Sequence, residues 1–166
     1  MSRPATAQAI PQMPGLRVAL VVSSYHHDIT ARLAAGAMAA LAAAGVAAHD
    51  IERLDVPGAY EIPYGARIAA VSGRIGAVVC LGCLIKGETP HFEYIASAVS
   101  HGIMQASIDQ GVPMAFGVLT TNSLEEAEAR VPEGPGNKGH EAAVAALTMA
   151  RLVQAWGGPA AAGTEG

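Results

Sequence analysis

Residues 77–111, AVVCLGCLIKGETPHFEYIASAVSHGIMQASIDQG, decide the fold. They begin with the uninterrupted apolar run 77–81, which is typical of a central strand covered on both faces of a parallel sheet. A loop over 82–90 follows, and the pattern over 91–110 then predicts a long helix that Gly111 ends. A buried strand, a short loop and a long helix in succession indicate a parallel α/β unit.

The rest of the chain repeats this alternation. Further strands are predicted over 16–23, 46–54 and 112–119, and the second of these has the polar alternation of an edge strand. Further helices are predicted over 29–44, 61–72, 123–130 and 140–156. Ser123 and Glu126 are expected to form a capping box at the start of the short one. The pattern therefore predicts an α/β protein, a three-layer αβα sandwich with a four-stranded parallel sheet.

Length and composition indicate a single domain. The chain has 166 residues, of which 51% are apolar and 14% charged, so it is not a disordered chain and can bury a core of its own. We expect the domain to span 15–156, between a flexible or extended N-terminal arm, 1–14, and a loose C-terminal tail, 157–166. Because 35 residues are alanine, the elements are expected to pack closely.

Charge and hydrophobicity exclude several kinds of partner. The net charge is −4 and no cluster of Lys and Arg occurs, so no nucleic acid is expected as a partner. The longest apolar stretch, 76–85, is about half the length of a membrane-spanning helix, so no membrane is expected either. Residues 1–15 lack the apolar core of a signal peptide, and we expect a cytoplasmic location.

Common cofactor and metal motifs are missing from the sequence. Neither the dinucleotide fingerprint G-x-G-x-x-G nor the phosphate loop G-x-x-x-x-G-K-[ST] occurs. Cys80 and Cys83 have C-x-x-C spacing, but Cys80 lies in a predicted buried strand and no second cysteine pair completes a zinc site. We therefore interpret both as reduced packing residues and predict no metal.

The loops that follow the strands are the candidate binding site, because ligands of parallel sheets bind at the carboxyl ends of the strands. The segment GCLIKGETPH, 82–91, leads into a long helix, whose free N–H groups and dipole favour an anion. His91 begins this helix and is a candidate for proton transfer near neutral pH. A well-capped helix with a structural histidine is the alternative interpretation.

The other candidate binding residues also have interpretations that involve no ligand. Tyr25 follows the first strand and can stack on a planar ligand, or it is an ordinary exposed loop residue. Glu61 can bind a polyol, or it is an acid favoured at a helix start. Phe116 belongs to the core by default, and Arg130 and Lys138 are solvated charges by default.

Five segments taken together are far more specific. They are VVSSYHHDIT (21–30), DVPGAYEIPYGA (55–66), LGCLIKGETPHFEYI (81–95), GVPMAFGVLTT (111–121) and EARVPEGPGNKGHEAA (128–143). In this order and at these intervals the sequence resembles the 6,7-dimethyl-8-ribityllumazine synthase family over nearly all of 15–156. The resemblance implies a flavodoxin-like fold and a cofactor-independent condensation of 5-amino-6-(D-ribitylamino)uracil with 3,4-dihydroxy-2-butanone 4-phosphate, the penultimate step of riboflavin biosynthesis.

The resemblance also implies roles for individual residues. Tyr25 takes the position of the aromatic residue that stacks on the pyrimidine, and His91 takes that of proton transfer. The other implied substrate-binding residues are Ala59, Tyr60 and Glu61 for the ribityl chain, Cys83, Leu84 and Ile85 for the pyrimidine, Glu88, Thr89 and Arg130 for the phosphate, and Phe116, from a neighbouring subunit, and Lys138 near the ring. Arg130 and residues 87–89 are expected to converge on one anion. His26 and Lys86 depart from the family, which often has Asn and Arg there.

Two other functions are alternatives to the synthase. A non-catalytic carrier of flavin or lumazine on the same scaffold is the main alternative, but it would have no use for His91 and Arg130. A flavodoxin-like signalling domain would need an acidic pocket after the first strand, and Ser23, Ser24 and Tyr25 supply none.

The helix over 91–110 also predicts an oligomer. Its core-facing stripe consists of Phe92, Ile95, Ala96, Val99, Ile103 and Ala106. The opposite side carries apolar or small residues where a solvated helix would carry charge, namely Tyr94, Ser97, Ala98 and Ile108. Residues 9–15 could add to the sheet edge of a neighbour. The family resemblance implies a homo-oligomer built on a pentamer.

Overall fold

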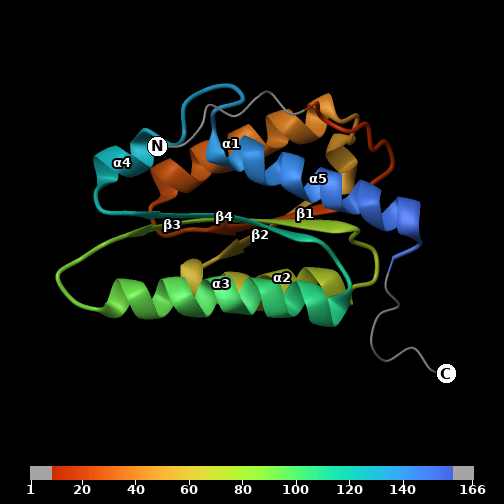
Figure 1. The fold of residues 1–166 in the computed structure, drawn as a ribbon. Coiled ribbons are helices and arrows are strands. Elements are labelled where there is room, and N and C mark those ends of the chain that lie inside the picture. Colours follow the sequence, from red (N-terminus) through yellow and green to blue (C-terminus); the bar gives the residue numbers. More distant parts are fainter. Residues whose placement is uncertain (1–8, 159–166) are drawn as a thin grey trace.

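The computed structural model describes residues 9–158, so most of the predicted arm, 1–14, and tail, 157–166, lies outside the described residues. Four parallel strands form one sheet in the order β2-β1-β3-β4, with helices on both faces (Figure 1). The predicted three-layer αβα sandwich is therefore confirmed. Within residues 9–158 no helix combines the length and the apolar character needed to cross a membrane.

The elements alternate along the chain as predicted. The strands are β1 (Val18–Ser23), β2 (Ile51–Val56), β3 (Ala77–Ile85) and β4 (Met114–Thr121). The helices are α1 (His27–Ala43), α2 (Ile62–Val71), α3 (His91–Gln110), α4 (Leu124–Glu128) and α5 (Lys138–Trp156), with short 3-10 turns at Ala48–Asp50 and Ala59–Glu61.

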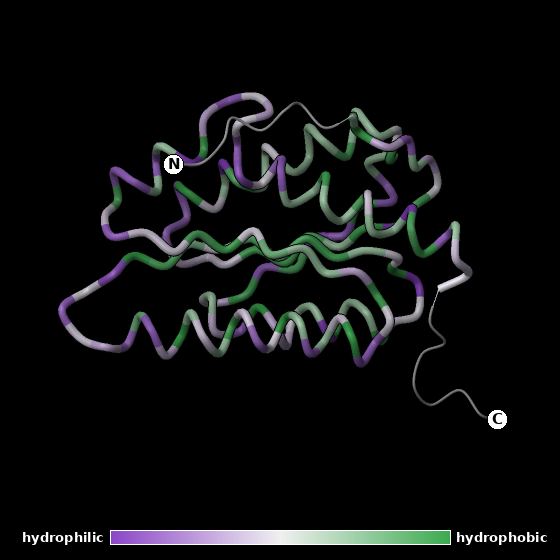
Figure 2. Tube along the Cα trace, viewed as in Figure 1, coloured by the Kyte–Doolittle hydropathy of each residue, from purple (hydrophilic) through white to green (hydrophobic). Residues whose placement is uncertain are grey.

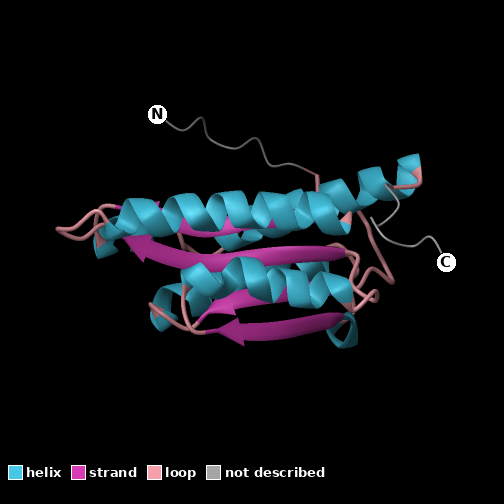
Figure 3. Ribbon diagram, turned by 90° about the horizontal axis from the view of Figure 1, so that it is seen from below, coloured by secondary structure: helices cyan, strands magenta, loops and turns pink. Residues whose placement is uncertain are grey.

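Two apolar cores lie on the two faces of the sheet. Side chains of β1 alternate between them, so that Leu20 and Val22 belong to the core with α1 and α5, whereas Ala19 and Val21 belong to the core with α2 and α3. Figure 1 shows these two helix layers on opposite faces of the sheet, and Figure 3 shows the molecule from the side of α2 and α3. The central strands β1 and β3 are apolar on both faces, and hydrophobic residues follow the sheet in Figure 2. Because β1 and β3 are central, loops from their carboxyl ends emerge side by side.

Several predicted boundaries shift. β3 runs four residues past its predicted end, because Cys83, Leu84 and Ile85 pair with Leu119, Thr120 and Thr121 of β4. The predicted strand 46–54 begins with the turn Ala48–Asp50 and becomes a strand only where β1 lies beside it. Likewise β4 occupies 114–121 rather than 112–119.

The starts of α4 and α5 also differ from the prediction. Ser123 caps α4 by accepting from the N–H of Glu126, but the Glu126 carboxylate accepts from the N–H of Asn122 rather than that of Ser123, which modifies the predicted capping box. The last helix begins at Lys138, two residues before the predicted start, because Asn137 caps it.

Asn137 is a buried connection between distant segments. Its Oδ1 accepts hydrogen bonds from the N–H groups of Gly139 (2.8 Å) and His140 (3.3 Å), and its Nδ2 donates to the carbonyls of Arg32 and Pro132, both at 3.1 Å. A Cβ added at Gly139 would overlap the Leu33 backbone carbonyl. The missing side chain lets α5 approach α1 closely enough for this amide to reach both.

The helix α3 is only lightly buried by its own chain. Its predicted core stripe is confirmed in direction, but only Val99 and Ile103 are fully buried. On the outer side Tyr94 and Ile108 are 74% and 68% exposed. The described chain therefore leaves an apolar face on α3 without cover.

The end of the predicted N-terminal arm packs on its own subunit. Met13 is buried, and its N–H donates to the carbonyl of Ala44 at 2.8 Å. The side chain of Gln12 donates to the carbonyl of Ala43 at 2.8 Å. Residues 12 and 13 thus close the end of α1, and the predicted addition of residues 9–15 to a neighbouring sheet stays a prediction.

Both cysteines are free and buried. Burial raises the pKa of Cys80 to about 12 and that of Cys83 to about 11. An apolar environment disfavours the thiolate, so both side chains act as small apolar residues at neutral pH.

Replacing Asn137 by Ala is expected to lower the free energy of unfolding by about 1–3 kcal/mol, because it leaves buried N–H and carbonyl groups without partners. Urea denaturation at fixed protein concentration measures the change. The exposed Asn122→Ala is the matched control and should leave stability unchanged. Equal stability of the two variants would contradict the proposed connection.

The cysteine pKa values predict how stability depends on pH. Thiols of the unfolded chain ionise near pH 9 whereas those of the folded protein resist, so stability should fall as the pH rises above about 9. The variant Cys80→Ala should show a shallower fall in alkaline urea titrations. Alkylation of the native protein at pH 8 should be much slower than that of the unfolded chain, and equally fast alkylation would refute the burial of these thiols.

Candidate active site in two hollows

A large hollow opens at the carboxyl ends of β1 and β3, beside the start of α3. Its volume is about 960 Å³, and we call it the main hollow. Most of the predicted site residues line it: Tyr25, Ala59, Tyr60, Glu61, Cys83, Leu84, Ile85, Thr89 and His91. Segments that are far apart in sequence meet here because parallel strands all end at the same edge.

Three of the predicted site residues line a different hollow. Phe116, Arg130 and Lys138 line a second hollow of about 340 Å³, beside the open edge of β4 and the first turns of α5. Glu88 is exposed in the loop 86–90 and lines neither hollow. Within one subunit, Thr89 and Arg130 therefore open on different hollows, so a single copy does not form the predicted joint anion site.

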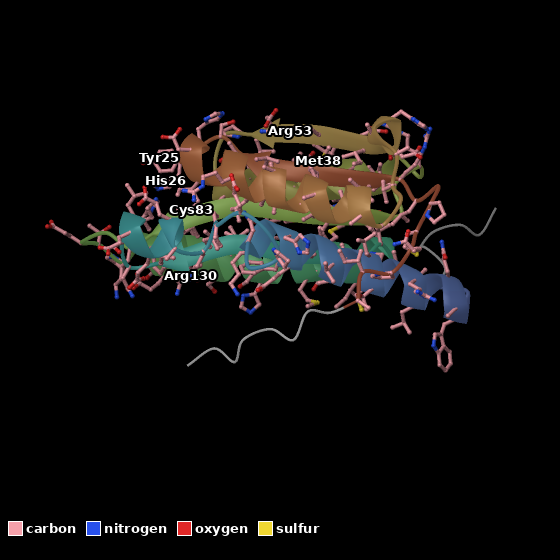
Figure 4. The ribbon with its side chains drawn as sticks, turned by 90° about the horizontal axis from the view of Figure 1, so that it is seen from above. Tyr25, His26, Met38, Arg53, Cys83 and Arg130 are labelled. Carbon is pink, nitrogen blue, oxygen red and sulfur yellow. The ribbon has the colours of Figure 1, made fainter. Side chains whose placement is uncertain are left out.

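The wall of the main hollow nearest β1 is aromatic. The N–H of Ser24 donates to the carbonyl of Val56 at 2.8 Å, which holds the turn after β1 against β2. Tyr25 then projects with 66% of its surface exposed, and its ring meets the imidazole of His26 edge to face. Figure 4 shows Tyr25, His26 and Cys83 together at this end of the sheet. An exposed ring in this position can stack on a planar heterocycle.

The segment after β2 contributes a carboxylate. Gly58 is extended, and the 3-10 turn Ala59–Glu61 begins where the N–H of Glu61 donates to the Gly58 carbonyl. The Glu61 carboxylate lies over Gly58, where a Cβ would approach its Oε2 to 3.2 Å. Glu61 is exposed on the hollow and can accept hydrogen bonds from hydroxyl groups.

The loop 86–90 and the start of α3 offer backbone donors. The N–H of Lys86 donates to the Thr121 carbonyl at 2.8 Å, and Lys86 Nζ lies 3.5 Å from a Glu93 carboxylate oxygen. No side chain caps α3, so its first N–H groups and the Thr89 hydroxyl are available to an anion. His91 begins the helix and lines the hollow next to them.

The second hollow carries the positive charge. Arg130 donates to the Glu126 carbonyl at 2.8 Å, and within residues 9–158 it forms no ion pair. Lys138 is paired with Glu141 at 2.8 Å. The N–H of Lys138 also donates to the Arg130 carbonyl at 3.0 Å, so the two cations are held in a fixed relation by the backbone.

Several residues that line the main hollow were not predicted from the sequence. Phe92 and Ile95, assigned to the core stripe, also line the main hollow, and so does Tyr94 from the outer side of α3. Tyr94 and Ile95 follow His91 by three and four residues, so helical spacing was the signal that could have found these two. His26, which departs from the family pattern, lines the same hollow. The described residues contain no group of three or more His, Cys, Asp or Glu side chains that could hold a metal ion.

Two comparisons with known proteins cover most of the chain. A family model described as 6,7-dimethyl-8-ribityllumazine synthase matches residues 15–154. A protein of Syntrophus aciditrophicus (strain SB) with the same name is 47% identical over 140 residues, which cover 84% of this chain and 91% of the relative. The match spans both hollows. The chain therefore belongs to the 6,7-dimethyl-8-ribityllumazine synthase family.

Proposed function

We propose that this protein condenses 5-amino-6-(D-ribitylamino)uracil with 3,4-dihydroxy-2-butanone 4-phosphate to 6,7-dimethyl-8-ribityllumazine, releasing phosphate and water. Membership of the family supports the reaction. The observation that carries it is the main hollow itself, where a stacking ring, a carboxylate, free backbone donors and a histidine surround one space.

The residues of the main hollow suit the ribitylamino substrate. Tyr25 stacks on the pyrimidine, and Cys83, Leu84 and Ile85 border it with the end of β3. Ala59, Tyr60 and Glu61 bind the ribityl hydroxyls, for which an exposed carboxylate and backbone groups are suitable partners. This places the reactive amine near the start of α3.

His91 is the group we assign to proton transfer. The amine attacks the ketone, water leaves to form an imine, phosphate is eliminated, and the ribitylamino nitrogen closes the ring with loss of a second water. Each step moves a proton between nitrogen, carbon and oxygen. An imidazole on the wall of the hollow can accept and return these protons near neutral pH.

The phosphate needs groups from both hollows. Thr89 and the N–H groups at the start of α3 offer neutral donors, whereas Lys86 is partly neutralised by Glu93. Glu88 belongs to the same loop and is the least suited of the proposed phosphate residues, because its carboxylate would repel the anion. Arg130 supplies the missing positive charge, but it lines the second hollow.

We infer that the second hollow of one subunit closes the main hollow of its neighbour. Phe116, Arg130 and Lys138 would then reach the pyrimidine and the phosphate from across the boundary. Three features support this arrangement: Phe116 is 47% exposed, the outer edge of β4 is unpaired within the described chain, and the apolar outer face of α3 lacks cover. A homo-oligomer built on a pentamer fits the family.

The protein is also proposed to act in the cytoplasm. Its two cysteines are free and buried rather than paired, as is usual for proteins of a reducing compartment.

Formation of the lumazine from both substrates, followed by its fluorescence, tests the proposed reaction. After subtraction of the uncatalysed rate, the turnover of His91→Ala is expected to be about 10²–10⁴-fold lower than that of the wild type, since the substitution removes acid–base assistance. The control is His49→Ala, whose side chain is 82% exposed and lines neither hollow. Undiminished turnover in folded His91→Ala would remove His91 from the mechanism, and ligand binding without turnover in the wild type would indicate a carrier.

Mixing two inactive variants tests whether the site is shared. His91→Ala damages the main hollow and Arg130→Ala the second hollow, so each alone should be nearly inactive. The Arg130→Ala subunit keeps an intact main hollow, and the His91→Ala subunit keeps an intact second hollow. In a random assembly of equal amounts, about a quarter of the neighbouring pairs combine these two intact hollows, so about a quarter of the wild-type activity should return.

Light scattering of the wild type should give a mass of at least five chains. Absence of recovery in an assembled mixture, or a fully active monomer, would contradict the shared site.

A further inference from the structure

We infer that His26 is a positioning residue, which holds the Tyr25 ring as a wall of the main hollow and does so in a backbone conformation that disfavours folding. The inference rests on the proposed function, because it takes Tyr25 to stack on the ribitylamino substrate.

The backbone of His26 is the first observation. With φ 55° and ψ 51°, it is the only non-glycine residue between 9 and 158 in the left-handed region, where every other residue with positive φ is glycine. A side chain with a Cβ is disfavoured in this conformation, and such strain gathers at functional sites. Within the described chain, the strain lies at the border of the main hollow.

The start of α1 does not explain why this residue is a histidine. The His26 carbonyl accepts from the N–H groups of Ile29 and Thr30, both at 3.0 Å, but its side chain makes no capping hydrogen bond. Gly or Asn would adopt the same backbone more readily, and Asn would also cap the helix. The fold thus gains nothing from the imidazole.

The imidazole contacts Tyr25 instead. The two ring centroids are 4.6 Å apart with planes at 71°, which is the favourable edge-to-face arrangement and the one aromatic pair among the described residues. His26 is half-buried in this contact, whereas the adjacent His27 is exposed and lines neither hollow. Among the described residues, the imidazole is the aromatic neighbour that restrains an otherwise exposed tyrosine ring.

A restrained ring binds a planar ligand at lower entropic cost. A free Tyr25 side chain would lose rotamer freedom when a pyrimidine stacks on it, whereas a ring already held by His26 loses less. His26 touches no reacting atom in this scheme. Its loss should therefore raise KM for the ribitylamino substrate and change neither kcat nor KM for the ketone phosphate.

Two substitutions separate this role from folding. His26→Gly and His26→Asn remove the imidazole but suit the left-handed backbone, so both variants should have a urea midpoint equal to or above that of the wild type. KM for 5-amino-6-(D-ribitylamino)uracil should rise about two- to tenfold, the range that an aromatic pair contributes. His27→Asn makes the same chemical change one residue away and should leave both values unchanged.

A double-mutant cycle shows whether His26 acts through Tyr25. In a Tyr25→Ala background, His26→Asn should have no further effect on KM. An unchanged KM in His26→Asn, a fall in stability of both His26 variants, or an equal KM effect with and without the Tyr25 ring would overturn the inference. Wild-type turnover is measured in the same assay, and its absence would reject the proposed function instead.

Discussion

The amide of Asn137 is the constraint on which the second half of the molecule depends. It is buried with both N–H donors and its oxygen engaged, and its partners belong to α1, to the loop before α5 and to α5 itself. A buried amide is stable only when its hydrogen bonds are made. The hydrogen bonds of Asn137 therefore fix α1, the loop before α5 and the start of α5 relative to one another. Gly36 and Gly139 leave the space that this arrangement requires.

The position of the charged residues follows from that constraint. Because Asn137 fixes the loop and the first turn of α5, the bond between the N–H of Lys138 and the Arg130 carbonyl sets the backbone spacing of these two residues. At the start of α3, Glu93 partly neutralises the charge of Lys86. Backbone N–H groups are therefore the main groups there that can attract an anion. Positive charge and the main hollow are thus built on different segments, which the proposed assembly of subunits would unite.

Local sequence signals predicted much of the fold. The bounds of α3 were predicted correctly, because Pro90 precedes its first turn and Gly111 ends it in the left-handed conformation. The predicted end of β3 was wrong, since Gly82 is typical of a loop. Gly82 and Cys83 continue the strand only because β4 pairs with them. Asn137 escaped notice because its bond to Arg32 spans 105 residues. Such nonlocal contacts leave no mark on the residues around them.

The candidate site was likewise predicted only in part from local sequence signals. Motifs after each strand identified the lining of the main hollow, since parallel topology brings those loops to one edge. The separation of Phe116, Arg130 and Lys138 into a second hollow depends on the open edge of β4, which follows from strand order and not from any motif. The left-handed backbone of His26 was equally invisible, because nothing in its neighbours requires it.

The light burial of α3 has a consequence for local motion. A helix held to its own sheet chiefly by Val99 and Ile103 has little apolar contact to oppose its detachment, so in an isolated subunit it is the long element that opens first. His91 and the uncapped N–H groups, which we propose bind the phosphate, lie on its first turn. In the proposed assembly, neighbouring subunits would therefore do more than complete the hollow: by damping the opening of α3 they would hold His91 and the loop 86–90 in one arrangement.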